Sequence, residues 1–241
     1  MMKKIVHIIL WLFLIAWFGV IMGFVSRRSD AVLCKRIDII ISDSATVRFV
    51  TPAQVRAMIK EPGFDVHGYP VGEINTREME HVLEENPYIR NAEVYTTVEG
   101  AIKIQVQQRT PLLRMMPGGD PGYYVDEEGY ILPLADGFTP RVFLVSGNIY
   151  LPDSVMQRGQ INGQPEKNGG MEKELQTLLA FARYVEGHPF WKNQVVQLYR
   201  DREGNYELIP RVGAHQILLG SLAGYQTKLR NLKLLYDQGF S

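Results

Sequence analysis

The sequence predicts an α+β protein with an N-terminal transmembrane helix, a small β-α-α-β-β unit, and a larger mixed β unit with flanking helices. Three observations lead to this prediction. Residues 5–25 form a run of 21 residues without formal charge. Residues 35–111 follow the order strand, helix, helix, strand, strand, and residues 112–241 combine short strands with helices. A tail at 1–4 and a tether at 26–34 complete the expected division.

The uncharged run at 5–25 has the length of a membrane span. A helix of this length reaches roughly 31 Å, about the thickness of the hydrocarbon layer. A cleaved signal peptide is the alternative, but its apolar core has only about 7–15 residues and ends at a small-residue cleavage site. Lys3 and Lys4 precede the run, and Arg27 and Arg28 follow it. Because basic residues stand on both sides, charge alone does not decide the orientation.

Two glycines of this helix, Gly19 and Gly23, form a G-x-x-x-G motif. This spacing lets two membrane helices approach closely, although glycine is also frequent in membrane helices in general. Beyond residue 30 the chain carries 22 basic and 25 acidic residues, a net charge of −3. That balance argues against a nucleic-acid-binding surface, which needs clustered positive charge. The single cysteine, Cys34, excludes an intrachain disulfide and is expected to be a small buried residue.

In the first unit, a strand is expected at 35–42, where isoleucines alternate with polar residues. Thr51 and Pro52 have the preferences of a helix start. Asn75 starts a second helix, with Glu78 at the capping-box position. Both helices have an apolar stripe, so they are expected to pack on one face of the sheet.

The second helix ends at Asn86 and Pro87, because the residue before proline is disfavoured in a helix. Strands at 89–97 and 101–108 then form a hairpin. Pro111 is expected to end the last strand.

In the second unit, a proline- and glycine-rich loop at 116–122 precedes a hairpin at 123–126 and 130–133. A strand is expected at 142–145 and a surface loop at 151–170. A helix begins at 171. Further strands and a final helix are expected at 194–200, 206–209, 215–219 and 222–236, with Leu229, Leu232 and Leu235 of that helix facing inward.

No motif of an enzyme is found, and we expect neither a cofactor nor a metal. Ser221 stands one position too early for the G-x-S-x-G motif. His81 and Glu84 lack a third metal ligand nearby. The neighbouring acids at 126–128 are expected to be solvated turn residues.

Several short motifs stand in a fixed order behind the basic tail and the membrane helix. They include Asn-Pro followed by a hydrophobic pair and alanine, Arg-x-Pro at the junction of the units, and Tyr-Val-Asp-x-x-Gly after it. The motif residues are Asn86, Pro87, Ala92, Arg109, Pro111, Tyr124, Asp126, Gly129 and Gly220. In this order the motifs resemble the FtsQ/DivIB family of bacterial division proteins, and the first unit resembles the POTRA domain of that family.

The sequence departs from the family pattern in four places. Gln108 stands where the family often has glutamate, and the turn at 98–100 lacks a common proline. Residues 148–170 resemble an insertion. The family usually carries one more strand after its C-terminal helix, whereas this sequence stops at Ser241. Either the sequence is truncated or its partner docking differs.

The resemblance implies a non-enzymatic scaffold of the division septum that joins FtsB-like and FtsL-like single-pass partners. It also implies that the tail lies in the cytoplasm and that the two units lie outside the cytoplasmic membrane. Docking is expected on the β domain, because a sheet edge offers unpaired backbone groups to an added strand. The expected docking residues are Gln216, Leu218, Leu219, Lys228, Leu229 and Leu232.

Two alternatives remain open. A membrane-anchored hydrolase would assemble its site from scattered residues such as Ser146 and His215 near strand ends. A POTRA-bearing secretion or outer-membrane assembly factor would continue into a β-barrel of many alternating strands, for which the chain has no room.

Overall fold

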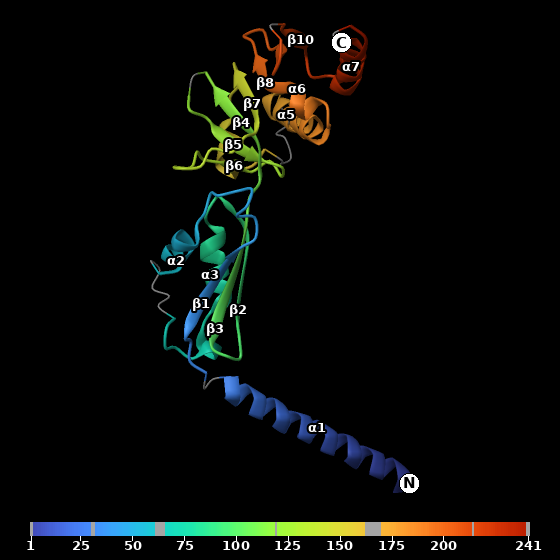
Figure 1. Cartoon of the computed structure of the whole chain (residues 1–241). Coiled ribbons are helices and arrows are strands. Elements are labelled where there is room, and N and C mark those ends of the chain that lie inside the picture. Colours follow the sequence, from blue (N-terminus) through green and yellow to red (C-terminus); the bar gives the residue numbers. More distant parts are fainter. Residues whose placement is uncertain are drawn as a thin grey trace. The chain divides into compact units, whose positions relative to one another are not determined.

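The protein is described from a computed structural model (Figure 1). The structure describes residues 2–29, 32–60, 66–118, 120–161, 170–213 and 215–239. Its contacts divide the chain into two compact units, Met1–Gln108 and Arg109–Ser241. Each unit has its own sheet, with three strands in the first and seven in the second. The α+β class is therefore confirmed.

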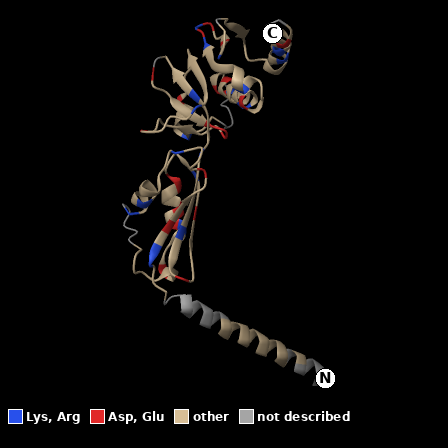
Figure 2. Cartoon of the chain, viewed as in Figure 1, with Lys and Arg blue, Asp and Glu red and all other residues tan. Residues whose placement is uncertain are grey.

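The first helix, α1, spans Met2–Ser29. Its side chains are described at residue 7 and residues 9–21, and within 9–21 the large apolar side chains are exposed on all sides. This part carries no charged residue (Figure 2). Among the described residues no helix is long and apolar enough to cross a membrane, so the transmembrane helix expected at 5–25 is not found there.

The first unit confirms the expected order of strand, helix, helix, strand, strand. Its elements are β1 (Arg36–Ile41), α2 (Pro52–Lys60), a short 3-10 helix (Val71–Glu73), α3 (Thr76–Glu84), β2 (Ile89–Thr96) and β3 (Ala101–Gln108). The strand order is β1-β3-β2, with β1 parallel and β2 antiparallel to the central β3. Helices α2 and α3 contact each other and lie over the sheet (Figure 1).

The helix signals read from the sequence operate as expected. The side chain of Asn75 accepts a hydrogen bond from the backbone N–H of Glu78, which satisfies one of the free amides at the start of α3. The apolar stripes supply the buried side chains of both helices, Val55 and Ile59 on α2 and Met79 and Leu83 on α3. Cys34 is buried as well, which confirms its expected place in the interior.

Gln108 shows why an amide suits a position where the family often has a carboxylate. The side chain is buried at the end of β3. Its Oε1 accepts from the N–H of Val50 at 2.8 Å, and its Nε2 donates to the carbonyl of Val47 at 2.9 Å. An ionised glutamate could not donate the second bond. Through these two hydrogen bonds, the side chain of Gln108 holds the loop before α2 against the end of β3.

The second unit is built on one mixed sheet with the strand order β10-β9-β8-β7-β4-β5-β6. The pairs β4–β7 and β7–β8 are parallel, and the remaining pairs are antiparallel. The strands are β4 (Pro111–Pro117), β5 (Tyr123–Asp126), β6 (Ile131–Leu132), β7 (Phe143–Gly147), β8 (Val195–Arg200), β9 (Tyr206–Pro210) and β10 (Ile217–Gly220). The helices are α4 (Asp153–Arg158), α5 (Gly170–Gly187), α6 (Trp191–Gln194) and α7 (Tyr225–Gly239).

The core of this unit lies between the sheet and α5, whose apolar stripe, Leu175, Leu178, Leu179, Ala182 and Val185, is entirely buried. Trp191 of α6 is fully buried beside it. Phe190 and Tyr236 pack edge-on against this indole ring, with ring centroids 4.8 and 6.1 Å away. Trp191 therefore joins α6 and α7 to the core.

Strand β4 was not expected. Pro111 was expected to end a strand, and the first strand of the second unit was expected at residue 123, but β4 runs through this stretch and lies between β7 and β5. Proline is tolerated at the first residue of a strand, where its missing N–H costs little. In the residues that follow, apolar and polar side chains do not alternate, because the strand is buried on both faces at several positions. The sequence therefore lacks the two-residue period that would have indicated a strand.

The prediction of a surface loop at 151–170 is wrong for its first part. Residues 153–158 form α4, whose Val155 is fully buried. Gly159 ends this helix with φ +65°, a left-handed conformation that glycine adopts without strain. Ser154 and Arg158 bind the buried carboxylate of Glu172. Residues 162–169 lie outside the described part of the chain.

The final helix starts later than expected, at Tyr225. Leu229 is fully buried and Leu232 is half-buried, in agreement with the prediction. The prediction that Leu235 faces inward is wrong, because its side chain is 60% exposed. The helix contacts the core through Tyr225, Leu229, Leu232 and Tyr236, which share one face, and Leu235 lies outside this stripe.

Candidate functional site

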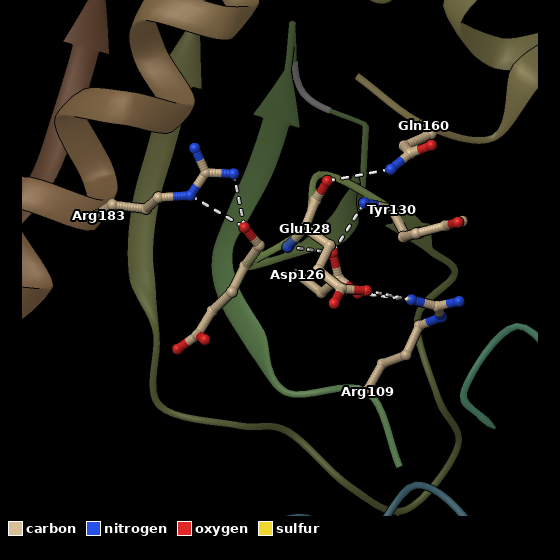
Figure 3. A network of polar contacts seen from close by, with 7 residues as sticks. Arg109, Asp126, Glu128, Tyr130, Gln160 and Arg183 are labelled. Atoms are coloured by element: carbon tan, nitrogen blue, oxygen red, sulfur yellow. Dashed lines mark hydrogen bonds and ion pairs between the residues drawn. The ribbon is translucent and has the colours of Figure 1, made fainter. Parts of the chain in front are cut away.

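The motif residues at the junction of the units come together in one polar network inside the second unit (Figure 3). Arg109 donates from a guanidinium nitrogen to the Asp126 carboxylate at 3.0 Å and lies 3.4 Å from the Glu128 carboxylate. The same guanidinium stacks 3.6 Å from the ring centroid of Tyr130. The side chains of Arg109 and Asp126 are only 13% and 4% exposed. This is a buried ion pair with a defined geometry.

Asp126 is therefore not the solvated turn residue that the sequence suggested. One carboxylate oxygen accepts from the backbone N–H groups of Glu128 and Tyr130 at 2.9 and 2.8 Å, and the other accepts from Arg109. Gly129 completes the turn with φ +88°, a conformation that disfavours any other residue. The aspartate thus fixes the β5–β6 turn while it neutralises Arg109.

Two further contacts tie this turn to the rest of the unit. Gln160 Nε2 donates to the carbonyl of Glu128 at 3.1 Å. Arg183 of α5 donates to the carbonyl of Glu127 through Nε and a terminal nitrogen, at 2.9 and 2.6 Å. Figure 3 shows Arg109, Gln160 and Arg183 around the turn; they come from the segment before β4, the segment after α4, and α5. The network holds the segment before β4, the β5–β6 turn and α5 together.

A second network lies between α5 and the sheet. Glu174 receives hydrogen bonds from Arg200 at 2.8 and 3.1 Å and from the hydroxyl of Tyr206 at 2.6 Å. Burial alone would raise the pKa of Glu174, but these hydrogen bonds and the charge of Arg200 outweigh it and hold the pKa below its ordinary value. Burial and the bond to Glu174 raise the pKa of Tyr206.

The lowered pKa of Glu174 predicts a pH dependence of stability. A carboxyl group whose pKa is lower in the folded state contributes stability above its unfolded pKa and loses it as the pH falls through the folded pKa. The Glu174→Gln variant should therefore lose less unfolding free energy than the parent between pH 7 and acidic pH. Urea unfolding measured at pH 7 and below pH 4 checks this. Parallel losses in both proteins would show that Glu174 does not couple to stability.

The expected docking residues lie on β10, on α7 and, for Gln216, directly before β10, which is the last strand at one end of the seven-stranded sheet. Gln216 is exposed, and Leu218 is 77% exposed. Leu219 and Leu229 face the core instead, so they position β10 and α7 rather than offer contact surface. Lys228 donates from Nζ to the carbonyls of Leu219 and Ser221 at 3.0 and 2.7 Å, which fastens α7 to the end of β10.

Comparison with known protein families settles the relationship. The model "FtsQ/DivIB, C-terminal related" matches residues 110–241, more than half of the chain. The chain belongs to the FtsQ/DivIB family. The model of a POTRA-like domain matches residues 32–107, so this family member combines both domain types. No curated protein matches the chain.

Membership in the FtsQ/DivIB family indicates a cell-division scaffold that acts through protein–protein contacts and is associated with the membrane at the division site. The family is generally not enzymatic. Asp126 lies within the matched residues and Arg109 directly before them, so their ion pair ties the segment before β4 to the end of β5.

The other motif residues of this FtsQ/DivIB member have mainly local roles. Asn86 Oδ1 accepts from the N–H of Tyr88 at 3.0 Å in the turn that Pro87 forms with it. Ala92 and Tyr124 are buried on β2 and β5. Gly220 ends β10 with φ +68°. Gly19 has no heavy atom within 4 Å of an added Cβ, whereas the surroundings of Gly23 lie outside the description.

The residues of the hydrolase alternative have separate partners. Ser146 Oγ accepts from Gln197 Nε2 at 2.7 Å, and His215 Nε2 contacts the hydroxyl of Tyr236 at 2.6 Å. A hollow of about 450 Å³ lies beside Ser146 at the carboxyl ends of β4, β7 and β8, and its lining includes Arg202. Across the described residues, no three His, Cys, Asp or Glu side chains gather to hold a metal.

Proposed function

We propose that this chain is a non-enzymatic scaffold of the bacterial division septum that links FtsB-like and FtsL-like single-pass partners. In this proposal residues 35–111 and 112–241 act as two domains, and the second one receives the partner. The docking element is β10, supported by the exposed Leu218 and Gln216 beside it. An extended partner segment would continue the sheet through its backbone groups.

The observation that carries the proposal is the unequal state of the two ends of the sheet. At one end, residues 159–161 cover β6: the N–H of Ile131 donates to the carbonyl of Gly159 at 2.9 Å, and the N–H of Ile161 donates to that of Gly129 at 2.7 Å. At the other end, β10 is the last strand in the described sheet order and pairs with β9 on one side. Strand addition is therefore favoured at β10.

The finer localisation is also part of the proposal. Helix α1 would anchor the chain in the cytoplasmic membrane, with residues 1–4 in the cytoplasm and both domains outside. Its support is the continuous exposed apolar surface of residues 9–21 and the membrane association of the family. An apolar surface of this extent is normally covered by lipid or protein. Pairing of two such helices through Gly19 and Gly23 remains a proposal of the same kind.

The Leu218→Lys variant tests docking at β10. Leu218 is 77% exposed, so the substitution should leave the fold unchanged, while a lysine on a strand edge opposes strand addition. In cells depleted of the parent protein, we expect filaments with stalled septa. The parent and the control Val212→Lys should restore division, because Val212 is also well exposed, at 70%, but lies in the loop before β10. Leu218→Lys should leave the cells filamentous.

A photo-crosslinking residue at position 216 identifies what lies beside β10 in the same cells. We expect crosslinks to small single-pass membrane proteins at position 216 and none from position 136, an exposed site beyond the covered β6 edge. Normal division after depletion would contradict the septal role. Restored division by Leu218→Lys, with no crosslink from position 216, would leave the scaffold role standing but contradict docking at β10.

A further inference from the structure

The outer edge of β2 in the first unit is occupied by carboxylates of the same chain. β2 is a terminal strand of the three-stranded sheet. The N–H of Thr97 donates to the carbonyl of Ala101, at the β3 end of the hairpin. Because backbone groups alternate in direction along an antiparallel strand, the N–H groups of Ala92 and Val94 point away from β3. These are the groups that an added strand would use.

Both outward amides have a partner on α3. Glu84 accepts from the N–H of Ala92 at 3.1 Å, and Glu80 accepts from the N–H of Val94 at 2.8 Å. Helix α3 packs closely along β2 (Figure 1), and Figure 2 shows acidic residues on this helix. Neither glutamate was singled out by the sequence for this role.

The spacing of the two glutamates matches the spacing of the two amides. Residues four apart on a helix are separated by about 6 Å along its axis and share one face. Residues two apart on a strand are separated by about 6.6 Å and point in the same direction. A Glu-x-x-x-Glu pair on α3 can therefore reach alternate amides of β2 at the same time. The match makes the contact a property of the fold rather than of one flexible side chain.

We propose that Glu80 and Glu84 close the β2 edge to strand addition, and that the pairing they prevent is antiparallel contact with β2 of a second copy of this chain. Any strand edge is complementary to itself about a two-fold axis, because donors and acceptors are exchanged by the rotation. Here the hairpin also presents Tyr95 and Val98, whose side chains are exposed. The glutamates satisfy the edge amides and would bring like charges together if two edges approached.

This inference is independent of the proposed function. The Glu80→Ala/Glu84→Ala variant of the full chain should expose the β2 edge. It is kept in a nonionic detergent, which covers the exposed apolar side chains of α1. At low concentration, amide hydrogen exchange at Ala92 and Val94 should become at least about tenfold faster than in the parent, the scale expected for losing a hydrogen bond to a charged group. At higher concentration, sedimentation velocity should detect dimers, and both amides should regain protection.

Two matched variants separate the hydrogen bonds from the charge. Glu80→Gln/Glu84→Gln keeps an acceptor oxygen at each position, so the amides should stay protected and the chain monomeric. Glu93→Ala/Glu99→Ala removes two charges from exposed positions of the same hairpin and should behave like the parent. If the double alanine variant is poorly folded, Glu84→Ala alone provides the test at Ala92.

Three results would overturn the proposal. The first is unchanged exchange and a monomeric state in the alanine variants. The second is dimer formation with Ala92 and Val94 still exchanging rapidly, which would place the contact elsewhere. The third is dimer formation by Glu93→Ala/Glu99→Ala to the same extent, which would make net charge the cause.

Discussion

The Arg109→Met variant is expected to lose about 3–5 kcal/mol of unfolding free energy in the second unit. Methionine keeps much of the apolar stem but leaves the Asp126 carboxylate, 4% exposed, without its countercharge. It also removes the guanidinium that stacks on Tyr130. Urea unfolding measures the loss. Trp191 is the one tryptophan beyond α1, so a chain with phenylalanine at positions 11 and 17 reports on this unit alone.

A second variant tells a broken ion pair from a general packing defect. In Arg109→Met/Asp126→Asn the remaining carboxamide carries no charge and can still accept from the N–H groups of the turn. Much of the lost stability should therefore return, which is the sign of coupling between the two residues. Arg141→Met, at an exposed arginine of the same unit, should be neutral within about 0.5 kcal/mol. A neutral Arg109→Met variant would rule out a structural role for the pair.

The Trp191→Ala variant is expected to lose a similar amount, about 3–5 kcal/mol, for a different reason. The indole is fully buried and contacts rings from its own segment and from α7. Its removal leaves a large cavity that these rings cannot fill without leaving their present positions. Far-UV circular dichroism during urea unfolding measures the loss, since this variant lacks the fluorescent reporter.

The control for this variant is Trp191→Phe, which keeps an aromatic ring and should cost clearly less. Because Tyr236 of α7 packs on Trp191, the alanine variant should also loosen α7 and with it the fastening of β10 by Lys228. We therefore expect faster amide exchange in α7 of Trp191→Ala than in the parent. Equal unfolding midpoints for the alanine and phenylalanine variants would contradict this account.

Local signals explain most of what was predicted correctly. The cap at Asn75, the alternation in β3 and the apolar stripe of α5 are each encoded within a few neighbouring residues, so periodicity and capping rules recognise them. The motif order led to the family, which the match over 110–241 confirms. The docking residues and the motif roles stay predictions, and the structure narrows the exposed contact surface to positions such as Gln216 and Leu218.

Elements that form through contacts with residues far away in the sequence were not predicted. β4 has no regular alternation, and it forms because β5 and β7 pair with it on both sides. The helix α4 is too short to show a full apolar period, and its buried Val155 has meaning only beside the core of the second unit.

The sequence by itself determined the α+β class, the order of elements in the first unit and the family, because these follow from local periodicity and from motifs read along the chain. The tertiary structure decided the roles of the acidic residues. Asp126 can be buried because the fold places Arg109, 17 residues earlier in the chain, against its carboxylate. Glu80 and Glu84 reach the edge of β2 because α3 packs along that strand. A carboxylate on a helix or in a turn is normally solvated. Only the neighbours brought by folding determine whether it becomes an ion-pair partner or the cover of a strand edge.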